Sequence, residues 1–204
     1  MIRHGATAAL CAALAVGAAQ AECLGPADLT RGVVVEYQTG DYTTIRRIGD
    51  GTHLIEERYA SGDAPWVLRA WHGVYFVEEW QLNAAGGREP GTTLVVEFPI
   101  DPARFPPPLP GLGWTGRTVN QFDDGTSREE TTILRFSQGA PLELSGCTYS
   151  TILAELRYDW GEEGGLDLRY LYLEELGTAI LEWSELDGED TAALVPVALR
   201  RASK

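Results

Sequence analysis

One stretch in the second half of the chain restricts the fold more than any other: residues 142–160 alternate between apolar and polar side chains over most of their length. A period of two is typical of a strand with one buried face, whereas a helix repeats every 3.6 residues. Ser145-Gly146 marks the place for a bulge or bend, because glycine tolerates the backbone angles that a bulge requires. We therefore predict a bent central strand, whose apolar face carries Leu142, Leu144, Ile152, Ala154, Leu156, Tyr158 and Trp160.

The chain from Gly32 onward repeats this kind of pattern in short β-favouring runs that are separated by turn signals. No long run shows helical spacing, and only residues 26–31 are a candidate for a short helix. Residues 73–80 and 177–183 echo each other faintly, each ending a group of runs in tryptophan. We therefore predict an all-β fold, an antiparallel meander that forms a curved sheet, half-barrel or incomplete barrel in two similar halves.

The N-terminus has the pattern of a secretory signal peptide over residues 1–21, with Arg3, a short apolar run and Ala19-Gln20-Ala21 as the cleavage motif. We expect cleavage after Ala21, a single β domain over residues 22–204, and a periplasmic or secreted location. Lipid attachment at Cys23 is disfavoured because Glu22 precedes it, where a small residue is needed. The apolar run is shorter than the roughly 20 residues of a membrane span, so we expect none.

Two cysteines, Cys23 and Cys147, follow the leader. An even pair in an oxidising compartment predicts a disulfide bond. The chain-entropy model gives a bridge across this long loop a value of roughly 4 to 5 kcal/mol. Two free thiols or a metal pair are the alternatives, although two cysteines alone cannot complete a tetrahedral metal site.

Residues 99–110 (PIDPARFPPPLP) hold six prolines. Proline removes backbone donors and favours extended conformation. We therefore predict a stiff crossover over the surface between the two halves. A ligand for an SH3-type domain is the alternative, which we disfavour in an exported protein.

Charge and motif content restrict the chemistry. The net charge is −14, and it becomes −15 when Arg3 leaves with the leader, which argues against binding to nucleic acid or anionic membranes. His53 and His72 stand outside any metal-binding spacing, and we expect them at the surface or in turns. No hydrolase signature is present. We therefore expect no cofactor and no metal, although an enzyme with a scattered site stays open.

Five Glu-Glu doublets recur along the chain. Where they lie in strands, the two neighbours point to opposite faces, so they do not form acid/base pairs like those of glycosidases. We expect them to keep strands soluble and sheet edges from aggregating. They are Glu56-Glu57, Glu78-Glu79, Glu129-Glu130, Glu162-Glu163 and Glu174-Glu175.

Three short elements resemble bacterial periplasmic proteins with a curved antiparallel half-barrel, similar to the lipoprotein-carrier and outer-membrane-lipoprotein families. They are the Pro/Gly-Trp element at residues 109–114, the cysteine-bearing segment at 145–149 and the turn at 172–177. The opening helix and the cavity arginine of the lipid carriers have no counterpart here. The resemblance implies a fold and a concave apolar face, and it carries over no functional residue.

The six tryptophans fall in or beside predicted strands, where they form either core or an aromatic-lined cavity. We expect a non-enzymatic periplasmic protein that holds an apolar small molecule or a lipid-like ligand on a concave sheet face. The alternative is an envelope module that binds another envelope protein or has a structural role. The candidate ligand-binding residues are Trp66, Trp71, Trp80, Trp114, Trp160 and Trp183.

Overall fold

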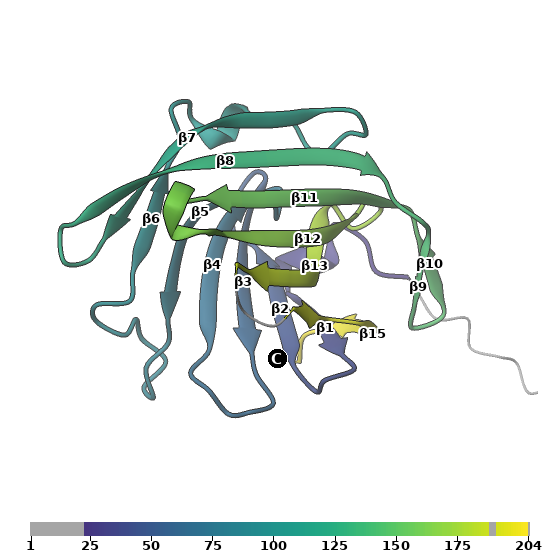
Figure 1. Ribbon diagram of the computed structural model, residues 1–204. Coiled ribbons are helices and arrows are strands. Elements are labelled where there is room, and N and C mark those ends of the chain that lie inside the picture. Colours follow the sequence, from purple (N-terminus) through teal and green to yellow (C-terminus); the bar gives the residue numbers. More distant parts are fainter. Residues whose placement is uncertain (1–22, 188–190, 204) are drawn as a thin grey trace, which may run out of the picture.

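The computed structural model describes residues 23–187 and 191–203, which are almost entirely β-structure (Figure 1). The described residues contain three short 3-10 helices, η1 (Asp28–Thr30), η2 (Pro102–Arg104) and η3 (Gly161–Glu163), and no helix there is long and apolar enough to cross a membrane. The predicted signal peptide lies outside the described residues. The strands are β1 (Val33–Tyr37), β2 (Tyr42–Arg47), β3 (Thr52–Arg58), β4 (Trp66–Trp71), β5 (Tyr75–Gln81), β6 (Leu94–Glu97), β7 (Gly113–Phe122), β8 (Ser127–Gln138), β9 (Leu142–Leu144), β10 (Cys147–Tyr149), β11 (Thr151–Asp159), β12 (Gly165–Leu173), β13 (Thr178–Leu186), β14 (Ala192–Ala193) and β15 (Pro196–Arg201).

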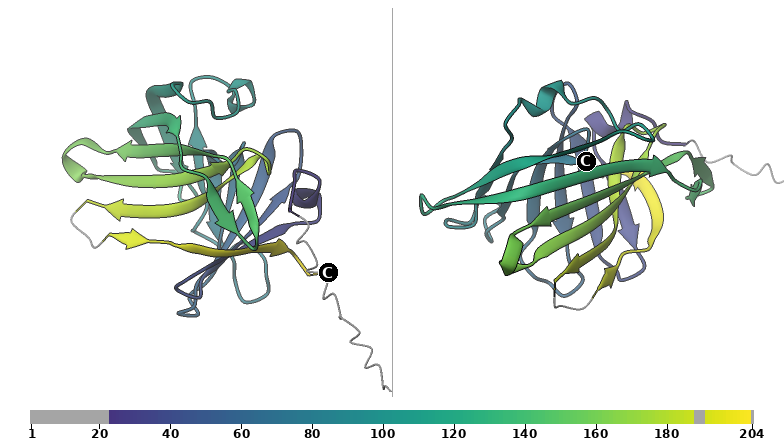
Figure 2. Two further views of the ribbon diagram at one scale, coloured as in Figure 1. Left: turned by 90° about the vertical axis from the view of Figure 1, so that its right-hand side faces the viewer. Right: turned by 45° about the horizontal axis from the view of Figure 1, so that its top comes forward.

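One antiparallel sheet of 13 strands, in the order β14-β13-β12-β11-β8-β7-β6-β5-β4-β3-β2-β1-β15, forms the body of the protein. Most neighbours in this order are consecutive in the chain, so the predicted meander and curved, incomplete barrel are confirmed. The sheet is strongly curled around an interior (Figure 2). The two halves that we predicted are parts of this one continuous sheet.

The two edge strands of the sheet are consecutive pieces of chain. Only Leu194 and Val195 separate β14 from β15. Leu194, directly after β14, donates its N–H to the Glu182 carbonyl of β13. Val195, directly before β15, accepts a hydrogen bond from the N–H of Gln38, which follows β1. The sheet is not closed into a barrel. Instead, the single bent segment that contains β14 and β15 contacts β13 on one side and the end of β1 on the other.

The predicted central strand is divided. Residues 142–149 form a separate hairpin of β9 and β10, and β11 begins two residues later. Ser145 and Gly146 have positive φ angles of 52° and 78°, the conformation of a two-residue turn whose twist suits a tight hairpin. A single bent strand over residues 142–160 is therefore wrong, because the turn reverses the chain completely. The remaining part, β11, lies in the sheet between β8 and β12.

The proline-rich segment links two strands that are direct neighbours, since Val95 of β6 pairs with Gln121 of β7. The segment packs back onto the sheet: Phe105 is buried and stacks on Tyr75 with 4.8 Å between ring centroids. The Tyr75 hydroxyl also donates to the Pro106 carbonyl at 3.0 Å. Residues 99–110 therefore cover part of the interior, whereas we expected them to cross between two halves.

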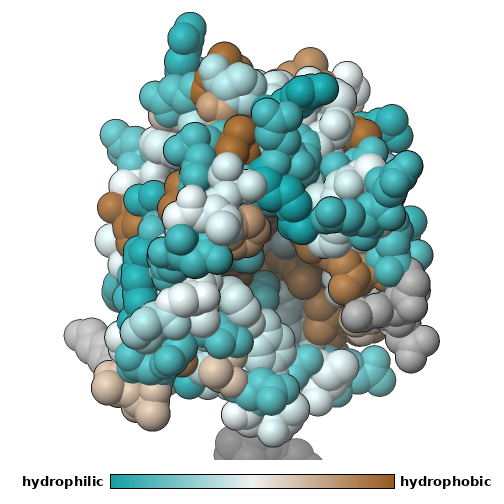
Figure 3. Space-filling view, turned by 60° about the vertical axis from the view of Figure 1, so that its left-hand side comes forward, coloured by the Kyte–Doolittle hydropathy of each residue, from teal (hydrophilic) through white to brown (hydrophobic). Residues whose placement is uncertain are grey.

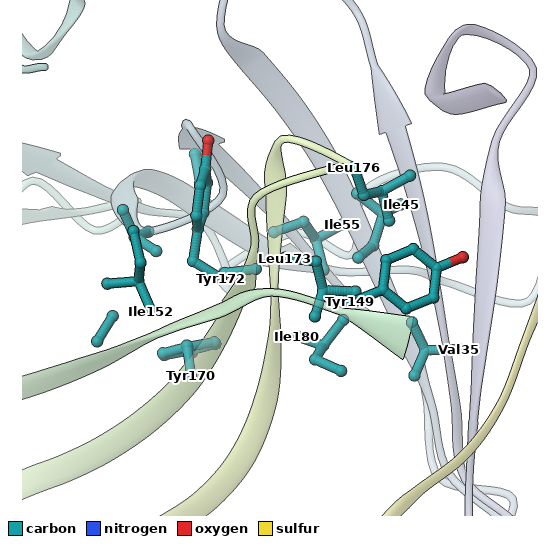
Figure 4. Close-up of a cluster of buried hydrophobic side chains, with 14 of the residues drawn as sticks. Val35, Ile45, Ile55, Tyr149, Ile152, Tyr170, Tyr172, Leu173, Leu176 and Ile180 are labelled. Carbon is teal, nitrogen blue, oxygen red and sulfur yellow. The ribbon is translucent and has the colours of Figure 1, made fainter. Parts of the chain in front are cut away.

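Apolar side chains of the sheet fill one end of the interior (Figure 4). The predicted Cys23–Cys147 disulfide is present and fastens the segment before η1 to β10. Beside it, the Leu24 N–H donates to the Tyr149 hydroxyl at 3.1 Å. The largest apolar side chains that are almost completely buried are Leu29, Ile45, Tyr149, Ile152, Leu173, Leu176 and Ile180.

Candidate functional site

The inward-facing side chains change character along the strands. On β8 they run from Phe136 and Leu134, which belong to the apolar core, to Thr132 and Glu130. On β12 they run from Tyr170, which belongs to the core and borders a cavity, to Leu168 and Leu166, which line the same cavity. The interior is therefore filled at one end and hollow at the other.

Two adjoining cavities of about 330 and 450 Å³ make up this hollow end. Both are lined by Leu68, Glu79, Leu166, Leu168 and Tyr170, so the cavities meet at these side chains. Figure 3 looks into the hollow: hydrophobic residues (brown) lie inside it and hydrophilic residues (teal) surround its opening. We refer to the two cavities together as the interior cavity.

The acidic residues that line the interior cavity include one from each of three Glu-Glu doublets, besides Asp41 and Glu78. Glu57 of β3, Glu79 of β5 and Glu130 of β8 are cavity-lining residues. Each is the second member of a Glu-Glu doublet, and its neighbour points to the opposite face. For these doublets, the expectation of a purely solvating role is wrong, because the curled sheet encloses one face. The outward members Glu56, Glu78 and Glu129 each pair with arginine.

Glu130 is held by neutral donors and is only 5% exposed. Thr118 Oγ1 and Asn120 Nδ2 donate to its carboxylate at 3.1 and 2.8 Å. Trp160 Nε1 donates at 2.8 Å. Thr118 is itself hydrogen-bonded to Thr132 Oγ1 at 2.7 Å. This network orients the carboxylate without providing a positive charge.

Glu79 lies where the two cavities meet. Burial, followed by the negative charges of Glu57 and Glu130, raises the pKa of Glu79 to about 7. Burial also raises the pKa of Glu57, while a hydrogen bond from the Tyr59 hydroxyl at 3.1 Å acts in the opposite direction. Near neutral pH, the cavity therefore holds carboxylates that are close enough to repel one another.

Aromatic side chains line the same cavity. Tyr158 and Tyr170 face it from β11 and β12, and burial raises both of their pKa values well above the usual range. At the opening, the Arg128 guanidinium lies 4.6 Å from the centre of the Trp160 ring. The alternation of residues 142–160 marks Tyr158 and Trp160 as inward-facing, so the sequence contains a signal for these two residues. Tyr170 is enclosed because the whole sheet is curled.

The structure places the six tryptophans in different surroundings. Trp160 lines the interior cavity. Trp114 instead packs in the covered end, with ring centroids 5.3 Å from Phe98 and 5.6 Å from Phe105. Trp66 shares the inward face with Glu57, its partner in the pairing of β3 with β4.

The other three tryptophans lie on the outer face of the sheet or beside surface pockets. Trp80 is buried beneath Arg88, whose guanidinium is 3.9 Å from the ring centre. Trp183 lies under Arg169 at 4.8 Å. Trp71 lines a separate surface pocket near the start of the proline-rich segment. The sequence-predicted set is therefore not brought together in one cavity.

The two histidines also separate. His72 has a φ of 51° and lies in the turn between β4 and β5, as expected. His53, by contrast, is only 2% exposed, and neither of its ring nitrogens has a hydrogen-bond partner within residues 23–187 and 191–203. Burial, with smaller contributions from His72 and Arg47, lowers its pKa to about 4. The expected surface position of His53 is therefore wrong. Across the described ranges, no three His, Cys, Asp or Glu residues are grouped to hold a metal ion.

Comparison with protein-family models, with curated proteins and with solved structures finds no significant match to this chain. The resemblance to periplasmic half-barrel proteins stays a prediction. The functional argument therefore rests on the geometry of the interior cavity.

Proposed function

We propose that this protein is a non-enzymatic binding or carrier protein that holds a small apolar molecule in the interior cavity. One observation carries the proposal: the sheet fills one end of its interior with its own side chains and leaves the other end hollow. A protein that needed only stability would gain from filling this space, because apolar side chains pack at high density in protein interiors.

The lining of the cavity supports this proposal. Ligand sites commonly occupy about 300 to 1,000 Å³ and combine apolar and aromatic walls with a few polar groups. The interior cavity has this size and this kind of lining, including Leu94, Phe122, Leu168, Tyr158 and Trp160. Its opening lies opposite the apolar core, so a ligand reaches it without displacing that core.

A periplasmic or secreted location belongs to the same proposal. The Cys23–Cys147 bridge supports it, since disulfide bonds persist mainly in oxidising compartments. A signal peptide over residues 1–21 would supply the route of export.

Binding of a neutral fluorescent probe tests the proposal. N-phenyl-1-naphthylamine becomes brighter in apolar surroundings, and we expect a saturable rise with one site per chain. Leu166→Trp fills the cavity from β12 and should abolish the rise. Arg169→Trp places the same side chain on the opposite, exposed face of β12 and should leave binding unchanged. No saturable binding by the wild-type protein, or equal binding by both variants, would refute the cavity as the site.

An envelope protein-interaction module is the second candidate, and one surface feature favours it. Ile100, Leu109 and Leu112 are exposed in and beside the proline-rich segment. Two results together would favour this second function. The folded protein binds no probe, and it captures an envelope partner that is lost when these three residues are changed to Ser.

A further inference from the structure

The interior cavity has an unbalanced charge. Glu57, Glu79 and Glu130 face it, and within the described part of the chain none of them forms an ion pair with arginine or histidine. Arg58 is paired with the outward Glu56 at 2.6 Å. Arg58 and Arg128 also line the cavity, and Arg128 lies against Trp160 and 3.9 Å from Glu163, so the acidic residues of the lining still outnumber the basic ones. A buried charge without an opposite charge is costly, so these carboxylates provide an incomplete site for a cation.

Asn120 provides a second, independent observation. Its side chain is 3% exposed and lines the cavity. Because a carboxylate can only accept hydrogen bonds, the Asn120 Nδ2 group faces Glu130, at 2.8 Å. Among the described residues, nothing forms a hydrogen bond with the buried Asn120 Oδ1. An unpaired acceptor beside a carboxylate matches a ligand that donates hydrogen bonds or carries positive charge.

The walls of the cavity suit the same kind of ligand. The rings of Phe122, Tyr158, Tyr170 and Trp160 line it, and the faces of aromatic rings attract cations. Leucines between them accommodate an apolar group. A fatty acid would instead bring its carboxylate towards three others, and like charges repel strongly where water is scarce.

We propose that the ligand of the interior cavity is an organic cation: an ammonium group, held beside Glu79 and against the aromatic rings, that carries an apolar chain or ring. This inference rests on the proposed binding function and specifies the ligand class. Glu79, where the two cavities meet, is the central counter-ion. Glu57 and Glu130 lie on either side of it in the two cavities.

Three ligands with the same eight-carbon chain separate charge from apolar contact: octyltrimethylammonium, 1-octanol and octanoate. Isothermal titration calorimetry at pH 8 and low salt should give the ammonium ion at least tenfold tighter binding than octanol, with octanoate weakest. In Glu79→Gln, the ratio of the ammonium affinity to the octanol affinity should fall about tenfold. Glu129→Gln removes an equal charge from the outer face of β8 and should change neither affinity.

The outcomes separate this inference from the proposed function. If octanol and the neutral probe bind but the ammonium ion gains nothing over octanol, the ligand class is wrong and the binding function stands. If none of the three ligands nor the probe binds, both proposals fail. An equal loss of ammonium affinity in Glu79→Gln and Glu129→Gln would show a general effect of net charge and would overturn the assignment of Glu79. If Glu79→Gln and Glu57→Gln both keep the full preference for the ammonium ion over octanol, the assignment of Glu79 as the counter-ion would also be overturned.

Discussion

Replacing Glu79 with glutamine should stabilise the protein in a pH-dependent way. The folded state raises the pKa of this carboxyl from 4.5 to about 7, chiefly through burial. The native state therefore binds more protons than the unfolded chain between these values, and stability falls as the pH rises through this range. At about 1.4 kcal/mol per pH unit, ionised Glu79 costs about 3 kcal/mol above pH 8 and almost nothing below pH 4. Glutamine resembles the protonated carboxyl and removes this cost.

Urea unfolding of the wild-type protein and Glu79→Gln, followed by tryptophan fluorescence at pH 4, 6 and 8.5 with the disulfide intact, measures the difference. We expect the two free energies of unfolding to agree at pH 4 and to diverge by about 2 to 3 kcal/mol at pH 8.5. Glu129→Gln, in an exposed pair with Arg117, should stay within about 1 kcal/mol of the wild-type protein throughout. A Glu79→Gln protein that is no more stable at pH 8.5 than at pH 4, relative to wild type, would refute our description of a buried, unpaired carboxylate.

Three further changes test the packing of the filled end. Replacing Cys23 and Cys147 with alanine should lower the free energy of unfolding by about 4 to 5 kcal/mol, and a loss below 1 kcal/mol would contradict the entropic value of the bridge. Tyr149→Phe leaves the buried Leu24 N–H without its partner and should cost about 1 to 3 kcal/mol in urea unfolding. In Gly73→Ala, a Cβ would lie 2.8 Å from a backbone nitrogen of β13 at a φ of 74°, so the melting temperature should drop by several degrees; an unchanged value would show that this close approach relaxes freely.

Much of the fold is readable in the chain because local rules decide it. Period-two alternation and frequent turn signals predict strands, and short connections between them predict a meander. The two cysteines that follow the predicted leader predict their own bridge. The sequence indicates a break in the strand at Ser145-Gly146, but it does not show that the chain reverses there. A bulge and a two-residue turn both use glycine, and only the pairing of β9 with β10 distinguishes them.

The site depends on information that alternation does not carry. Alternation with a period of two shows that a strand has an apolar and a polar face. It does not show which face a curled sheet encloses. Glu129 and Glu130 are equivalent in sequence, yet one is exposed beside Arg117 and the other is buried among neutral donors. The tryptophans illustrate the same limit, since Trp160 and Trp183 both end or flank alternating runs and lie on opposite faces.

The sequence by itself determined the class of fold, the pairing of its cysteines and the position of its turns, because each depends on residues that are near in the chain or few in number. The tertiary structure alone decided which end of the interior is filled and which carboxylates meet inside it. Those features arise from the curvature of the whole sheet, which brings β3, β5, β8 and β12 around one space.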